Sequence, residues 1–438
     1  MQAKRTRPRL LQAMIDAFSL PDLRRRLLIT FGVLAAARLI AHVPVPGVNS
    51  TALAQLFNQN ALLGMLDLFS GGALRYFSVA AMGVYPYITA SIVMTLITPI
   101  IPRLQAISKE GEAGRDRINL ITHWLTVPMA ALAGYGQLVL LQREGAIAQT
   151  DVLGAAAIIL SMIAGTLFMV WLGEQITSYG IGNGISIIIF GGIVAGLPTL
   201  IGQGFLAKSQ FVGLAVYLLI ALLTAALIVV FTEAHRRIPV QYAQTVIRSG
   251  RMYRKSGESH IPLRVNSAGM IPLIFAASLV IFPSIVASYF AAASTATPNL
   301  ANQIMNIFKP DAPLPLGFIY WGLYFFMAVA FAFFYTMVMF EQQDLPGTLQ
   351  RQGGFVPGIR PGKQTQSYLT GVITRITWAG ALFLGFVAIE PFLAEHISNI
   401  TTIQLSSFGM IIVVGVVLDT MKQLEAQLVM RRYEGFIK

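Results

Sequence analysis

Long apolar stretches alternate with short polar ones along almost the entire chain of 438 residues. A helix that crosses a lipid bilayer needs about 20 mostly apolar residues. Stretches of roughly this length occupy ten ranges: Leu27–Val43, Phe77–Ile101, Ile118–Leu141, Val152–Leu172, Ile185–Ile201, Phe211–Phe231, Ala268–Phe290, Leu314–Phe340, Ile373–Leu393 and Ile400–Leu418. An eleventh, Ala61–Phe69, is too short to cross and is followed by Gly71-Gly72. The pattern predicts an all-α polytopic membrane protein with ten transmembrane helices and one short re-entrant or interfacial helix.

Composition supports a lipid environment. Hydrophobic residues make up 55% of the chain and charged residues 11%, whereas about 25% of residues are charged in a typical soluble domain. The chain has no cysteine. This excludes disulfides, thiolate metal sites and cysteine nucleophiles.

The positions of the basic residues predict the orientation in the membrane. The net charge is +12, and 25 of the 31 Lys and Arg residues lie in the two terminal segments and in alternate loops. Lys and Arg concentrate on the cytoplasmic side of membrane proteins. We therefore expect both termini in the cytoplasm. Residues 1–26 form a basic arm whose apolar residues recur at helical spacing, which suits either an interfacial helix or a partner-docking helix rather than a cleavable signal peptide.

Two cytoplasmic loops, residues 233–264 and 341–370, are each about 30 residues long and rich in Gly, Pro and Arg. Loops of this length are usually functional. Both fit strand–turn–strand protrusions that dock an acidic or RNA-bearing partner. The alternative is that their charge only sets the topology.

The predicted spans contain little that a pump or an enzyme would use. Coupled transporters carry ionisable groups deep in their helices, but here Arg38, Glu390 and Asp419 lie toward helix ends. No HExxH or phosphate-binding loop is present. The profile favours a passive conduit worked by an outside motor. The alternatives are a secondary transporter of a small solute, an intramembrane enzyme and a ribosome-binding anchor without a pore.

Small residues and prolines suggest a bundle that can move. Gly192 and Gly196 are spaced for close packing, either inside the bundle or at a dimer face. Pro86, Pro128, Pro272 and Pro283 lie within predicted spans, where prolines create bends; two of them open similar Thr/Ser/Ala-rich turns in the second and seventh spans. Five spans precede residues 202–210 and five follow, which indicates two oppositely oriented halves.

Several long motifs carry a resemblance to a known family. They are Ser70-Gly71-Gly72-Ala73-Leu74, Pro86-Tyr87-Ile88-x-Ala90-Ser91-Ile92, Lys109-Glu110-Gly111-Glu112, Trp171-Leu172-Gly173-Glu174-Gln175-Ile176-Thr177, Gly180-Ile181-Gly182-Asn183-Gly184-Ile185-Ser186-Ile187 and Phe355-Val356-Pro357-Gly358-Ile359-Arg360-Pro361-Gly362. From about Leu27 to the C-terminal tail, the chain resembles the SecY/Sec61-alpha family of protein-conducting channels.

The resemblance implies an hourglass channel built as a clamshell. Its units are a cytoplasmic segment 1–26, an N-terminal half 27–201 with a plug at about 61–70, a hinge 202–210, a C-terminal half 211–424 with docking loops 233–264 and 341–370, and a tail 425–438. The positions that match the waist of the channel are Val84, Ile88, Ile185, Ile189, Ile274 and Ile412. Val84 stands where the family usually has Ile, so a slightly wider ring is expected. Without the resemblance, these side chains would be assigned to the core or to lipid.

Further site residues are also implied by the resemblance. The plug and its tether would comprise Leu62, Leu63, Met65, Leu66, Phe69, Gly71 and Gly72, although an ordinary interfacial helix fits the same sequence. The lateral gate would include Thr89, Asn266 and Phe282. Residues that would dock SecA or the ribosome are Arg251, Arg254, Lys255 and Arg360, with the first three assigned less firmly because Arg placement in their loop departs from the family pattern.

The resemblance also implies partners and a location. They are SecE and SecG in a heterotrimer, the SecA ATPase, the ribosome, signal sequences, nascent polypeptides and membrane lipid. The expected location is the bacterial plasma membrane. No cofactor, metal ion or catalytic residue is expected, and the chain is not expected to be an enzyme.

Overall fold

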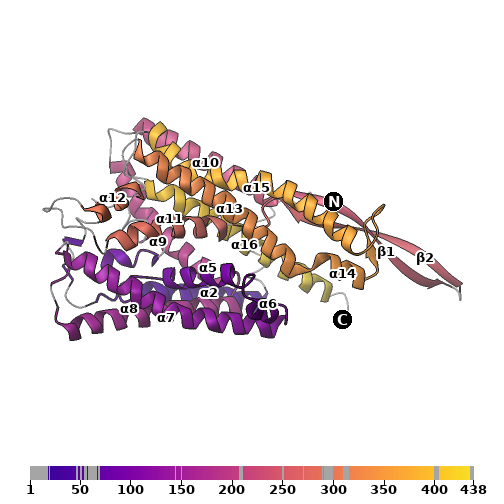
Figure 1. Ribbon diagram of the computed structural model, residues 1–438, viewed down its shortest axis with the longest axis horizontal. Coiled ribbons are helices and arrows are strands. Elements are labelled where there is room, and N and C mark those ends of the chain that lie inside the picture. The colour runs from indigo at the N-terminus through magenta and orange to yellow at the C-terminus, as the bar shows by residue number, and fades with distance from the viewer. Residues whose placement is uncertain are drawn as a thin grey trace, which may run out of the picture.

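A computed structural model of the chain is almost entirely helical, with one small sheet (Figure 1). It describes residues 18, 20–45, 48–49, 52–53, 57, 67, 70–143, 145–148, 150–206, 211–248, 251–269, 271–288, 290, 299–308, 315–398 and 404–434. The elements are α2 (Pro21–Ile40), η1 (Leu74–Tyr76), α5 (Tyr85–Ile97), α6 (Pro102–Ser108), α7 (Glu112–Arg143), α8 (Val152–Tyr179), α9 (Gly184–Leu206), α10 (Phe211–Glu233), β1 (His235–Arg248), β2 (Arg251–Arg264), α11 (Ile271–Ser288), α12 (Leu300–Ile307), α13 (Leu316–Gln343), α14 (Leu345–Arg351), β3 (Gly354–Phe355), α15 (Lys363–Ser398) and α16 (Gln404–Glu434).

Each apolar stretch expected to span the membrane overlaps a helix: α2, α5, α7, α8, α9, α10, α11, α13, α15 and α16. Four helical segments of the described chain are by themselves long and apolar enough to cross a bilayer: Glu112–Gln142, Val152–Tyr179, Leu316–Arg351 and Lys363–Glu390. A fifth candidate is the pair α5 and α6, which is bent by 103° at the break between them. Helix α12 was not anticipated from the sequence.

The helix α5 begins later than the apolar pattern suggests. The stretch was expected to start at Phe77, but Phe77 has a left-handed backbone with φ of 41°, and Gly83 has φ of 53°. The helix starts at Tyr85, with Pro86 in its first turn. Proline is favoured there because its missing N–H would have no helical partner. Pro272 likewise lies in the first turn of α11, so these two prolines start helices, whereas Pro128 and Pro283 lie inside them.

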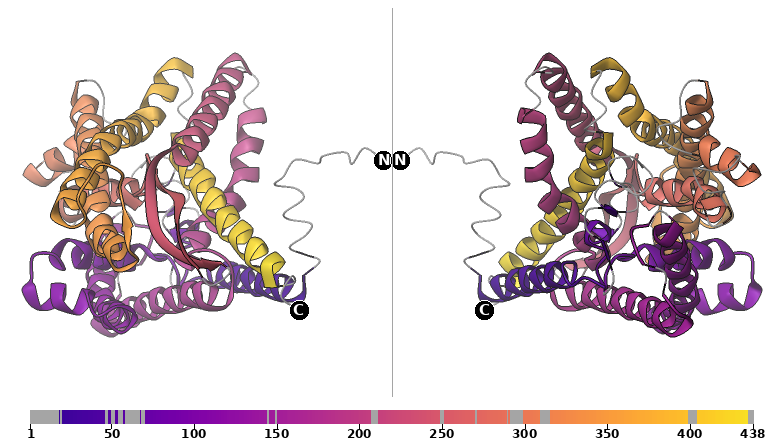
Figure 2. Two further views of the ribbon diagram at one scale, coloured as in Figure 1. Left: turned by 90° about the vertical axis from the view of Figure 1, so that its right-hand side faces the viewer. Right: turned by 90° about the vertical axis from the view of Figure 1, so that its left-hand side faces the viewer.

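The N-terminal and C-terminal helices form two groups that face each other (Figures 1 and 2). Within the first group α5 packs on α7, and α7 on α8; within the second, α13 packs on α11 and α15. The groups meet where α11 contacts α5 and α7, and where α16 contacts α9. Helix α9 continues through Leu206, so part of the expected hinge 202–210 is helical, and residues 207–210 lie outside the described residues.

A continuous apolar core runs between the two groups and draws on nearly all of the long helices. The outer faces of these helices are apolar as well. Leu153, Leu222 and Phe326 are 79%, 74% and 70% exposed. Exposed apolar area on this scale marks a surface that contacts something other than water, in agreement with helices that face lipid.

A long β-hairpin projects from one end of the molecule beyond the helices (Figure 1). Strands β1 and β2 are antiparallel in register from His235↔Arg264 to Arg248↔Arg251. The strand–turn–strand prediction for residues 233–264 is therefore confirmed. For residues 341–370 it is wrong: this loop forms the helix α14 and the two-residue strand β3, which pairs with β1 through Gln241↔Phe355 and Tyr242↔Gly354. One three-stranded sheet, in the order β2-β1-β3, thus joins the two loops.

Candidate functional site

The six aliphatic residues expected to form a waist come from four helices. Val84 precedes α5 and Ile88 lies in its first turn, Ile185 and Ile189 lie in α9, Ile274 in α11 and Ile412 in α16. Val84, Ile88, Ile189 and Ile412 are at most 6% exposed, and Ile185 and Ile274 are half-buried. All six belong to the main apolar core, which is large, so the ring itself stays a prediction.

One of the six has a contact away from the others. A Cβ added to Gly173 of α8 would lie 2.6 Å from the Cδ1 atom of Ile185. The end of the Ile185 side chain therefore packs against α8. Of the six, Ile185 is the least suited to face a central opening.

The expected lateral gate corresponds to the seam between α5 and α11, which are in contact. Thr89 lies on α5, and its hydroxyl donates to the Tyr85 carbonyl at 2.9 Å, within its own helix. Asn266 is 8% exposed in the turn before α11, and Phe282 is 43% exposed on α11. Asn266 and Phe282 are not brought together, because Phe282 lies about 16 Å along α11 from the start of that helix.

Residues 70–74, called the tether below, form a tightly bonded turn with Asp67. The Gly72 N–H donates to the Asp67 carbonyl at 2.8 Å, and the Ser70 hydroxyl donates to the same carbonyl at 2.9 Å. The Asp67 carboxylate forms an ion pair with Arg75 Nε at 2.8 Å and accepts the Arg75 backbone N–H at 3.2 Å. Burial raises the pKa of the Asp67 carboxyl, and the Arg75 charge opposes that rise. The expected plug residues Leu62, Leu63, Met65, Leu66 and Phe69 lie outside the described residues.

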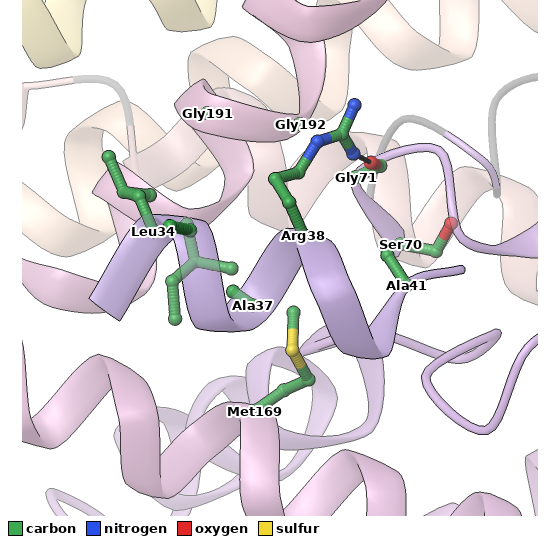
Figure 3. Close-up of a pocket in the computed structure, with 11 residues that line it drawn as sticks. Leu34, Ala37, Arg38, Ala41, Ser70, Gly71, Met169, Gly191 and Gly192 are labelled. Atoms are coloured by element: carbon green, nitrogen blue, oxygen red, sulfur yellow. Dashed lines mark hydrogen bonds between the residues drawn. The ribbon is translucent and has the colours of Figure 1, made fainter. Parts of the chain in front are cut away.

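The tether rests on α2 and α9 (Figure 3). The Arg38 guanidinium of α2 donates a hydrogen bond to the Gly71 carbonyl. A Cβ added to Gly192 of α9 would lie only 2.1 Å from the Gly71 Cα atom. A cavity of about 170 Å³ lies beside this contact, lined mainly by α2, α9 and the tether, with Met169 of α8. Gly192 therefore packs internally, while a Cβ added to Gly196 would meet no atom of the described residues.

The other candidate surface is the sheet at the projecting end. Arg360 is exposed, and its carbonyl accepts the Thr365 hydroxyl at 2.9 Å. It follows a turn closed by the Ile359 N–H and the Val356 carbonyl at 3.0 Å. Further exposed basic residues at this end are Arg236, Arg237, Arg264, Arg351 and Lys363. In β2, the backbones of Arg251, Arg254 and Lys255 pair with Arg248, Thr245 and Gln244, which places all three in the outer half of the hairpin.

A second, smaller apolar core fixes this sheet to the helices. It contains Ile238, Val240 and Leu263 from the hairpin together with Phe340, Leu349, Val356, Leu369, Val372 and Ile373. Val356 and Leu349 are 3% and 6% exposed. The turn that carries Arg360 is thereby held in a defined position relative to the bundle.

Among the described residues, no group of three or more His, Asp or Glu side chains is placed to hold a metal ion. The ionisable contacts between helices are isolated pairs. His123 of α7 lies 3.0 Å from Glu174 of α8, and Lys422 of α16 lies 2.8 Å from Glu233 at the end of α10. Pairs of this kind connect neighbouring helices.

Comparison with known proteins decides between the classes of function that the sequence left open. A model of the SecY family matches residues 78–421. The chain belongs to the SecY family. It is 42% identical to the protein translocase subunit SecY of Halalkalibacterium halodurans, with 97% of this chain and 99% of the relative covered. It is 40% identical to the SecY subunits of Streptomyces lividans, covering 98% and 100%, and of Pseudomonas aeruginosa, covering 98% and 96%.

Solved structures agree on the fold. A SecY channel studied for the role of its plug domain in the closed state matches with a TM-score of 0.66 at 15% identity, covering 95% of this chain and 97% of that one. Sec61 in a canine ribosome–channel complex matches with a TM-score of 0.62 at 15% identity, covering the same shares. SecY proteins are multi-pass membrane subunits of the protein translocase and are not enzymes, so the enzyme hypothesis is excluded.

Two features of the tether were missed from the sequence. Arg38 was noticed only as a charge near a helix end, and Asp67 was not singled out. Both interrupt apolar segments, and a charge in such a segment predicts a buried partner. The identity of each partner, a backbone carbonyl for Arg38 and Arg75 for Asp67, depends on tertiary structure that no local pattern encodes.

Proposed function

We propose that this chain is the protein-conducting channel subunit of a bacterial Sec translocase. It passes unfolded secretory polypeptides across the plasma membrane and releases signal sequences and membrane helices sideways into lipid. The observation that carries this proposal is its identity of about 40% to translocase subunits over 98% of the chain.

The channel architecture follows the predicted halves. Ten helices span the membrane, with both termini cytoplasmic; residues 27–201 and 211–424 form the two halves, and residues 202–210 form the hinge. The proposal is supported by the two facing helix groups, by their contact at α5 and α11, and by the excess of Lys and Arg at the terminal segments and alternate loops. Sideways release would occur along the α5–α11 seam, near Thr89 and Phe282.

The waist is a ring of Val84, Ile88, Ile189, Ile274 and Ile412, with Ile185 at its edge. The cargo has any sequence, so an effective lining makes no specific hydrogen bonds. A narrow aliphatic constriction also resists wetting and so raises the barrier to ions. In the resting channel the plug, residues 61–70, closes the outer side.

The cytoplasmic sheet docks the partners that drive transport. These are the SecA ATPase, through Arg360, and the ribosome, through Arg251, Arg254 and Lys255. Exposed arginines form strong paired hydrogen bonds with carboxylates and phosphates. SecE and SecG complete the complex. Support comes from the exposure of Arg360 and from the structural likeness to a channel solved on a ribosome.

The test is site-specific crosslinking of a stalled secretory chain. A photoreactive residue replaces Ile88 or Ile274, and the complex is supplied with SecA and ATP. A crosslink to the mature part of the cargo that requires both SecA and ATP is expected. The matched control replaces Leu279, which is 41% exposed on the same helix as Ile274 and is expected to crosslink to lipid.

Two outcomes are decisive. If cargo is transported but crosslinks at Leu279 rather than at Ile88 or Ile274, the aliphatic ring is ordinary helix packing. If no cargo is transported by a folded complex with SecA and ATP, the channel function is wrong.

A further inference from the structure

Arg38 is a charged side chain in an apolar helix, and within the described part of the chain its guanidinium donates a hydrogen bond to a backbone carbonyl. It is half-buried on α2 and donates to the Gly71 carbonyl. Charged groups within membrane segments are costly and are generally retained for a function. A bond to a carbonyl also depends on where the main chain lies and not on the side chain that the residue carries. The Arg38 hydrogen bond therefore forms only when the main chain of the tether lies in this position.

The tether behaves as one unit because it is bonded to itself. The Leu74 N–H donates to the Ser70 hydroxyl at 3.1 Å, and Ser70 in turn donates to Asp67. The Gly72 N–H and the Arg75 side chain close the same turn on Asp67. Fixing a single carbonyl in such a unit fixes the position of all its residues.

The tether also contacts α9, at a point where backbone meets backbone. Gly71 has φ of 69°, and Gly192 would collide with it if it carried a Cβ. Beside this contact lies the cavity of about 170 Å³, next to Ser70, Gly71, Met169 and Ile188 (Figure 3). Ala73 and Leu74 bury the far end of the tether in the core, so Arg38 and the Gly192 contact fix the end that carries Ser70 and Gly71 beside the cavity.

We propose that Arg38 is a positioning residue that holds the tether of the plug on α9 and so stabilises the sealed resting channel. The proposal rests on the proposed function in that the tether belongs to a plug. Arg38 acts through the Gly71 carbonyl. Opening moves the tether, so the Arg38–Gly71 hydrogen bond must break before polypeptide passes.

The natural absence of cysteine allows a direct test. Ala73 is 0% exposed, and Ala73→Cys places a single thiol next to the tether's bonded core. The rate of its modification by a small methanethiosulfonate reagent is measured in membranes holding the full complex without cargo. Arg38→Met in this background is expected to raise that rate at least tenfold, with a smaller rise for Arg38→Lys, which keeps a donor.

A second pair of variants tests the seat from α9. Gly192→Ala forces a Cβ against Gly71 and is expected to raise the modification rate in the same way. Gly196→Ala makes the same change one turn later, where the space is open, and is expected to leave the rate unchanged. If Arg38→Met does not accumulate in the membrane, the modification rates of Arg38→Lys, Gly192→Ala and Gly196→Ala test the proposal in its place.

Cargo transport by the Ala73→Cys complex is recorded in the same membranes, so that the two proposals fail separately. Normal transport with modification rates that change less than twofold in Arg38→Met and Gly192→Ala overturns the role of Arg38. Absence of transport, with rates that rise as expected, contradicts the channel function and leaves the Arg38 contact supported.

Discussion

At the scale of single residues, ion pairs of similar length differ in what surrounds them. Asp67 and Arg75 lie 2.8 Å apart, with the Asp67 side chain 7% exposed. Arg117 and Glu110 lie 3.1 Å apart, with side chains 65% and 46% exposed. Water screens the second pair and replaces either partner at little cost. The Asp67 carboxylate is buried, so water does not readily replace Arg75 as its partner.

We predict that Arg75→Ala destabilises the protein by about 1–3 kcal/mol at neutral pH, the cost typical of leaving a buried polar group poorly paired. Asp67 lies between the first two predicted spans, and burial raises its pKa. A raised folded-state pKa gives stability that is present below the unfolded pKa and is lost as pH rises through the folded pKa. Without Arg75 the rise is larger, so the deficit grows from acid to neutral pH.

The measurement is the midpoint of thermal unfolding in detergent across that pH range, for the parent and for Arg75→Ala. Arg117→Ala serves as the exposed control and is expected to cost less than about 1 kcal/mol. A deficit for Arg75→Ala that is the same at every pH would show that the Asp67 charge is not involved.

At the scale of elements, the sheet and α14 pack into one structural unit, and the turn that follows β3 carries Arg360. Leu349 of α14 is 6% exposed in the small core that also holds Val356. Leu349→Ala is expected to cost about 2–5 kcal/mol locally, because the removed side chain leaves a cavity. Amide hydrogen exchange of β3 and of the turn after it is expected to accelerate. Gln350→Ala, which changes an exposed neighbour, is expected to leave exchange unchanged, and equal exchange in both variants would contradict the anchoring role.

We predict that Arg360→Glu abolishes SecA-dependent export while the protein stays folded in the membrane. Arg360 is exposed, and among the described residues its carbonyl is the group that accepts a hydrogen bond, so the substitution removes the proposed docking charge and keeps that contact. Export by membrane vesicles is the measurement, and Arg360→Lys, which keeps the charge but loses the planar fork, is expected to export at an intermediate rate. Normal export by Arg360→Glu would contradict docking through this residue.

Helices and strands were predictable from the sequence where a local sequence pattern determines their position. Apolar length located the long helices, and the hairpin was expected from a loop of about 30 residues rich in Gly, Pro and Arg. The strand β3 was not predictable, because its two residues are ordered by pairing with Gln241 and Tyr242, more than 100 positions away. The start of α5 was missed because apolar length conceals the left-handed residue Phe77. The contact of Arg38 with the tether was missed because its partner is the backbone carbonyl of a glycine, which no side-chain pattern indicates.

At the scale of the whole molecule, the two helix groups share one apolar core and are joined by a few helix–helix contacts within and beside it. These are the contacts of α11 with α5 and α7, the contact of α9 with α16, and a small cluster of Leu23 of α2, Ile181 just before α9 and Leu424 of α16. In the proposed clamshell, opening exposes the apolar surface buried at these contacts, and the cost rises with the apolar area exposed. The residues at these contacts therefore set the balance between the closed and open channel.

Ile412 is such a residue, since it is 3% exposed on α16 within the core that both groups share. Ile412→Asn places an amide there, and burying an unpaired amide costs about 1–3 kcal/mol. Opening would expose it to water and relieve that cost, so the substitution favours the open state. We predict about a tenfold gain in export of a cargo with a defective signal sequence, which corresponds to about 1.4 kcal/mol, together with a measurable ion leak.

Val417→Asn on the same helix, where the side chain is 42% exposed, adds the same amide outside the shared core and is expected to leave both signal discrimination and leak unchanged. If the two variants behave alike, the effect comes from weakening α16 in general, and Ile412 has no place in the seal.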